Sequence, residues 1–328
     1  MRRTRARTLA ALAVVTIGLA GCSSALPTPQ PEALPAVAPA ALVDSQVSRI
    51  LDEVTSALAD ADALQSADAL GARIGSTAKE IRAAQYVQAA AGAAGALTEI
   101  PPTSQTIIAP ATTEWPRTLM VVTTAPEDLR APLLLTLVQE SPRAAYTLMS
   151  WVRLFPGTQM PATAQPSIGS APVDGASQEV ATSPIDVVAR YVDVLAKGSD
   201  SDFAEAFSAD PLRERIAQQR AGWTEAVGEQ GSVAESYEIL SAEPSSLATA
   251  DGGAIVVGTV RTVTAISLVD STLTVGDQTA ALLGSSEVSS SLVISWDSVV
   301  AFSVPPAGSA DPIVVLGAEH APISVTGS

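Results

Sequence analysis

The chain has 328 residues, of which 47% are hydrophobic, and its 34 acidic residues against 18 basic ones give a formal net charge of −16. A surface with this excess of carboxylates repels a phosphate backbone, which argues against nucleic acid as a partner. The sequence contains one cysteine and one histidine. A disulfide within the chain, a metal site with several thiolates and a centre with several histidines are therefore excluded.

The first 21 residues have the pattern of a bacterial secretion signal. Four arginines within the first seven residues precede an apolar stretch at 9–20, which is too short to span a bilayer. Leu19, Ala20, Gly21 and Cys22 resemble the lipobox of bacterial lipoproteins. This resemblance implies that a diacylglycerol is transferred to the Cys22 sulfur and that the chain is cleaved before it. We therefore expect an extracytoplasmic protein anchored to the cell membrane through Cys22; an ordinary secreted protein is the alternative.

Proline-rich stretches predict how the rest of the chain is divided. Residues 22–40 are rich in proline, which favours an extended tether. A second stretch at 157–183, rich in Pro, Gly, Ser and Thr, predicts a linker. The remaining chain then forms two domains, at 41–156 and 184–328.

A short internal repeat indicates that these two domains arose by duplication. The segment 66–74, SADALGARI, recurs as SADPLRERI at 208–216, with six of nine positions identical. The two copies occupy similar places in their halves, which favours duplication over coincidence.

Each half is expected to begin with helices and to continue with strands. Apolar residues at helical spacing from Val43 to Leu58 predict one helix, and 69–91 predicts another. In the second half, the pairs Ser183-Pro184 and Asp210-Pro211 each predict a helix start. The predicted strands are 98–108, 117–124, 133–138, 145–155, 233–239, 254–268, 291–304 and 313–325. Helices followed by strands predict an α+β protein with two tandem duplicated domains.

This order of elements resembles the nuclear-transport-factor-like and cystatin-like folds. The overall layout is also similar to envelope lipoproteins of GC-rich Gram-positive bacteria. The resemblance implies that each domain is cone-like, with a curved antiparallel sheet around an N-terminal helix. It carries no functional residue over to this sequence.

Aromatic residues of the second half are the candidates for the walls of a pocket in such a cone. They are Tyr191, Phe207, Trp223 and Trp296. Asp193 and Asp297 lie beside them in the sequence, and an aspartate with a raised pKa is able to act as a general base. The alternative is that these aromatic residues simply form the core.

No motif in the sequence predicts a catalytic residue, a metal site or a cofactor. The acidic pairs at 60–62 and 200–202 lack the later glycine and glutamate of a calcium loop. His320 is expected to be solvated or merely hydrogen-bonded. The leading hypothesis is a non-catalytic envelope lipoprotein that binds another envelope protein or a small apolar ligand. One alternative is a carboxylate-based isomerase or hydrolase with a cone-shaped pocket. Another is an accessory subunit of a transporter or secretion machine.

Overall fold

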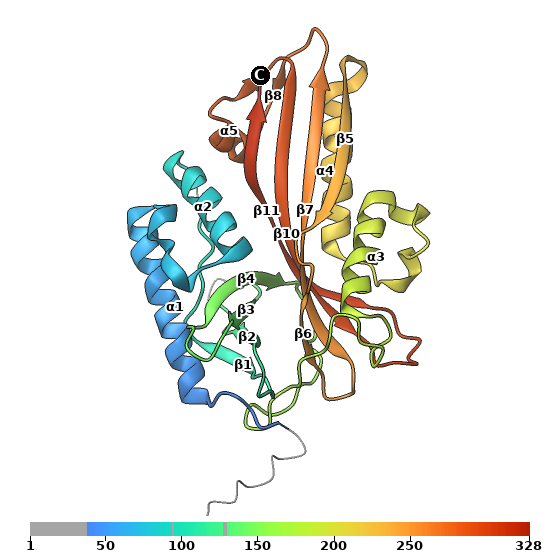
Figure 1. Ribbon diagram of the computed structural model, residues 1–328. Coiled ribbons are helices and arrows are strands. Elements are labelled where there is room, and N and C mark those ends of the chain that lie inside the picture. The colour runs from blue at the N-terminus through green and yellow to red at the C-terminus, as the bar shows by residue number, and fades with distance from the viewer. Residues whose placement is uncertain (1–37, 94, 127–129) are drawn as a thin grey trace, which may run out of the picture. The chain divides into compact units, whose positions relative to one another are not determined.

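The computed structural model describes residues 38–93, 95–126 and 130–328 (Figure 1). All of these residues belong to one compact unit, 36–328. The signal, Cys22 and most of the expected tether lie outside the described residues. Within them, the predicted α+β class is confirmed, because helices cover a large antiparallel sheet.

The first half contains two α-helices and four strands in the described residues. They are α1 (Asp44–Leu64), α2 (Ser76–Ala90), β1 (Ser104–Ile108), β2 (Arg117–Thr123), β3 (Leu133–Gln139) and β4 (Thr147–Leu154). The helix predicted at 69–91 begins only at Ser76, because Gly71 has a positive φ of 60° and Ile74 is extended. The strand predicted at 98–108 is also shorter. Pro101 and Pro102 precede β1, and neither has the N–H that a strand ladder requires.

The second half continues with further helices and strands. They are α3 (Pro184–Lys197), α4 (Pro211–Val227), β5 (Gly231–Ile239), β6 (Ser245–Ala248), β7 (Ala254–Leu268), β8 (Leu273–Thr274), α5 (Asp277–Leu283), β9 (Glu287–Val288), β10 (Ser291–Val304) and β11 (Val314–Gly327). Both predicted helix starts are confirmed. The Ser183 hydroxyl accepts a hydrogen bond from the Asp186 amide at 3.3 Å, and Asp210 accepts one from the Arg213 amide at 3.0 Å.

Nine strands of the described residues form a single sheet. Its order is β1-β2-β3-β4-β11-β10-β7-β5, and β6 pairs with β7. Strands β5, β7, β10 and β11 run side by side (Figure 1). The two halves meet where Gly317 and Ala318 of β11 pair with Leu154 and Arg153 of β4. Glycine is required there, because a Cβ at Gly317 would lie 2.3 Å from the Arg153 carbonyl oxygen.

The segment 157–183 is hydrogen-bonded to both halves. Ser170 exchanges two backbone hydrogen bonds of 2.8 Å with Ala109 and Ala111 of the first half. A few residues later, the Val173 amide donates to the Ser246 carbonyl at 3.1 Å. The division into domains at this segment stays a prediction. Through these hydrogen bonds, the segment connects β6 to the first half.

The sheet is covered on both faces. Val299 and Ala301 of β10 pack with residues of α1 and α2, whereas Val300 and Phe302 pack with residues of α3. Because neighbouring side chains of a strand point to opposite faces, β10 contributes to both cores.

Candidate ligand-binding cleft

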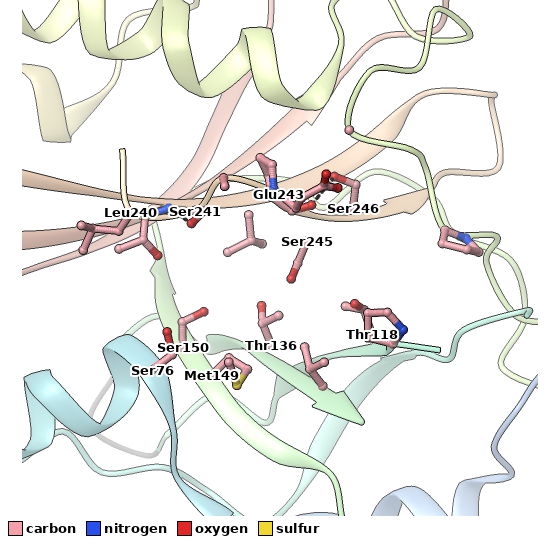
Figure 2. Close-up of a pocket in the computed structure, with 18 of the residues that line it drawn as sticks. Ser76, Thr118, Thr136, Met149, Ser150, Leu240, Ser241, Glu243, Ser245 and Ser246 are labelled. Carbon is pink, nitrogen blue, oxygen red and sulfur yellow. Dashed lines mark hydrogen bonds between the residues drawn. The ribbon is translucent and has the colours of Figure 1, made fainter. Parts of the chain in front are cut away.

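A cleft of about 560 Å³ lies between the strands of the first half and the β5–β6 connection of the second. Its floor is formed by β2, β3 and β4, and its opposite wall by residues 240–246 together with Val257 and Thr259 of β7. Figure 2 shows Thr136 and Ser150 on the floor, with Ser241 and Ser245 on the opposite wall. The first turn of α2 and residues 172–175 complete the lining.

Strand register explains why the floor carries hydroxyl groups. Thr136 of β3 lies opposite Met120 of β2 and Ser150 of β4, so the three side chains point to the same face. Leu135 and Leu137 point to the other face and join the core beneath α1 and α2. The sequence thus places small polar side chains on the cleft face of an otherwise apolar sheet.

The Thr136 hydroxyl is the most informative group on this floor. Its side chain is 2% exposed, and Oγ1 has no hydrogen-bond partner among the described residues. A buried hydroxyl without a partner costs about 1–3 kcal/mol of stability. A water molecule or a polar ligand in the cleft would supply the missing partner.

The opposite wall is fixed by hydrogen bonds to neighbouring elements. The Leu240 amide donates to the Thr259 carbonyl at 2.9 Å, and the Thr259 amide donates to the Ser241 hydroxyl at 2.8 Å. Ser246 accepts from Val173, as described above. These bonds hold the β5–β6 connection in place, so the protein's own hydrogen bonds fix the position of this wall.

The charged side chains that line the cleft are all acidic. They are Glu140, Asp174 and Glu243. Among the described residues of the lining there is no lysine, arginine, histidine, phenylalanine, tyrosine or tryptophan. At one end, no side chain caps the N-terminus of α2, so the amides of its first turn are available as donors.

We expect the Thr136→Val substitution to stabilise the ligand-free protein by about 1 kcal/mol, because it removes an unpaired buried hydroxyl without changing the side-chain shape. Urea unfolding of the purified protein measures this change. Thr118→Val is the matched control, since Thr118 lies on the same floor but is only half-buried. A clear loss of stability in Thr136→Val alone would show that the hydroxyl already has a partner.

The predicted aromatic residues Tyr191 and Phe207 lie in the core beneath α3. Their ring centroids are 5.3 Å apart, and Phe302 packs against both. The Tyr191 hydroxyl donates to Asp210 at 2.9 Å, and burial raises the Tyr191 pKa well above its usual value. Phe207 also borders a groove of about 470 Å³ between α3 and α4, which is separate from the cleft.

The predicted carboxylates are both paired with cations. Asp193 receives a hydrogen bond from Ser201 at 2.6 Å and lies 2.5 Å from Lys197, and the Lys197 contact holds its pKa below the usual value. Asp297 is fully buried and accepts two hydrogen bonds from Arg261, at 2.7 and 2.9 Å. Both carboxylates are thus held in ion pairs, which favour the charged form over the protonated form.

Trp296 stacks on His320 at a centroid distance of 4.8 Å, and Trp223 packs against the same core. His320 Nδ1 lies 2.8 Å from the Ser298 hydroxyl, and Nε2 lies 3.1 Å from the Gln219 side-chain oxygen. Because that oxygen only accepts, Nε2 carries the proton and the Ser298 hydroxyl donates to Nδ1. Burial lowers the His320 pKa to about 3, so the ring is neutral.

None of the six predicted pocket residues lines the cleft. The one sequence signal for the cleft is Thr136, a hydroxyl inside the apolar run LLLTLV of β3.

Within the described residues, no group of three His, Cys, Asp or Glu side chains is placed to hold a metal ion. In the same part of the chain, no helix combines the length and apolar character needed to cross a membrane.

The fold and the cleft define an α+β protein with a polar cleft between its two halves. The chain belongs to the family described as "Domain of unknown function (DUF8094)", whose model matches residues 35–327. No curated protein and no solved structure matches the chain. The family match runs through both halves and includes every residue of the cleft.

Proposed function

We propose that this protein is a non-catalytic envelope lipoprotein that holds a small polar ligand in the cleft. The observation that carries the proposal is the buried, unpaired Thr136 hydroxyl in a cavity of about 560 Å³. Ligand sites typically occupy about 300–1,000 Å³ and contain a few well-placed polar groups. The lining therefore favours a polar ligand over the apolar one predicted from the sequence.

The carboxylate-based enzyme has less support than a binding protein. Asp193 and Asp297, the candidates for its base, are both held by cations as described above. The lining of the cleft contains no histidine, cysteine, lysine or tyrosine among the described residues. Its titratable side chains are three carboxylates at exposed positions, where no buried partner activates them.

We further infer that the two halves descend from one duplicated unit. Each half has two principal helices followed by a meander of sequential strands, β1-β2-β3-β4 in the first and β5-β7-β10-β11 in the second. The last strands of the two meanders, β4 and β11, pair with each other. The repeat at 66–74 and 208–216 supports the same relationship, and a cone-like ancestor for each half is part of the proposal.

The proposed location depends on the lipid anchor at Cys22. The intact mass of the mature protein, purified from its own envelope, tests this. We expect a chain that begins at Cys22 and carries a diacylglyceryl group, because two acyl chains give stable membrane attachment. The Cys22→Ser variant is the control and should lack the lipid mass. A mature protein cleaved at another bond, without lipid, would contradict the anchor.

Native mass spectrometry of the same protein tests the binding function. We expect a small-molecule adduct that disappears on denaturation. The adduct should also be lost from a Ser245→Trp variant, because Ser245 lines the cleft and an indole would fill part of it. An adduct that persists in this variant, or no adduct in the wild type, would contradict the proposed function.

A further inference from the structure

The charge of the cleft restricts the ligand more closely than its size does. Glu243 lies on the β5–β6 connection, beside the neighbouring segment 172–175. A Cβ built on Gly175 would lie 3.4 Å from the Glu243 carboxylate oxygen. Glu140 follows the end of β3, and Asp174 adjoins Gly175. Three different segments thus bring carboxylates to one cleft, without a basic side chain in the described lining.

This arrangement disfavours anions. A phosphate or carboxylate ligand would meet three like charges, and the uncapped amides at the start of α2 offer only a partial positive charge. An ammonium group in the ligand instead forms charge-assisted hydrogen bonds with carboxylates. The acidic side chains therefore select for a neutral or cationic ligand.

The floor shows what the rest of the ligand requires. Thr118, Thr136 and Ser150 present hydroxyl groups, each of which both donates and accepts. The described lining has no aromatic ring on which a flat ligand would stack. The unpaired Thr136 Oγ1 supports a polar ligand independently of the carboxylates, because Thr136 is 2% exposed and lines the same cavity.

We propose that the ligand is a hydroxylated amine of the amino-sugar class. Its hydroxyl groups bond the floor at Thr136 and Ser150, and its ammonium group lies near Glu243. This inference rests on the proposed binding function and specifies the chemistry of the same site.

Three hexoses of similar size and different charge test the proposal. They are glucosamine, glucose and glucose 6-phosphate, titrated calorimetrically into the full chain at neutral pH. We expect glucosamine to bind about tenfold more tightly than glucose, because it adds hydrogen bonds between charged groups. Glucose 6-phosphate should show no binding. No binding of glucosamine, or tighter binding of glucose 6-phosphate, would overturn the proposal.

Two variants assign the contributions of individual groups. Glu243→Gln should reduce the preference for glucosamine over glucose about fivefold, whereas Glu238→Gln, an exposed residue of β5 outside the cleft, should leave it unchanged. Thr136→Val should weaken both sugars about fivefold while the protein remains folded. If glucose and glucosamine bind equally well and Thr136→Val weakens both, the proposal of an amine ligand is overturned. The cleft would then still be the binding site. The native mass measurement decides the binding function without reference to these sugars.

Discussion

Replacing Arg261 by leucine is expected to lower the free energy of unfolding by about 3–5 kcal/mol, because it leaves a buried carboxylate without its counter-charge. Asp297 is 0% exposed and receives both of its hydrogen bonds from this one guanidinium. Arg261 Nη2 also lies 2.5 Å from the Glu80 carboxylate of α2, so the same side chain joins the first half to β7 and β10. Urea unfolding at neutral pH measures the loss.

Two further variants show where this energy originates. Glu80→Gln should change stability by less than about 1 kcal/mol, because the Glu80 side chain is 52% exposed. The double variant Arg261→Leu, Asp297→Leu should recover much of the loss, since neither member of this pair then leaves an unpaired buried charge. If the double variant is less stable than Arg261→Leu alone, the cost arises from packing and not from the unpaired carboxylate.

The second large effect is a loss of stability on acidification that depends on His320. The unfolded chain binds a proton at His320 below a pH of about 6.5, whereas the folded protein does so only near its pKa of about 3. The unfolded state therefore binds more protons throughout this window. The stabilisation is complete above pH 6.5 and is lost progressively as the pH falls. Between pH 6.5 and 5 the loss is about 2 kcal/mol.

The His320→Gln variant isolates this contribution. His320 is the only histidine in the sequence, but burial raises the pKa of its neighbour Glu319, which has the opposite effect on stability as the pH rises. Both proteins contain Glu319, so the difference in unfolding free energy between wild type and variant reports His320. We expect this difference to shrink by about 2 kcal/mol from pH 6.5 to 5. A difference that does not change with pH would contradict a neutral, buried imidazole.

Local signals in the sequence were sufficient for the α+β class and for several element boundaries. Ser183-Pro184 and Asp210-Pro211 predict helix starts because an N-cap side chain and proline act within one turn. The prediction for 69–91 was less accurate, because the positive φ at Gly71 interrupts the chain inside a pattern that otherwise favours helix. The joining of the two meanders depends on two residue pairs between β4 and β11, far apart in the sequence. No local pattern indicates such a pairing.

The cleft was not predictable for a similar reason. Its floor comes from β2–β4 and its opposite wall from residues 240–246, which the fold brings together across about 100 residues of chain. The sequence predicts large aromatic residues as pocket walls, yet Tyr191 and Phe207 are buried in the core. Thr136, in contrast, is an ordinary strand residue until its surroundings show that its hydroxyl is buried without a partner.

A crystal structure of the protein purified from its native source tests the central claim most directly. We expect electron density for a small molecule in the cleft, with an oxygen or nitrogen atom within hydrogen-bond distance of Thr136 Oγ1. The same molecule should account for the adduct mass. A cleft that contains only disordered water, while the adduct occupies another part of the protein, would contradict the claim that this cleft is the binding site.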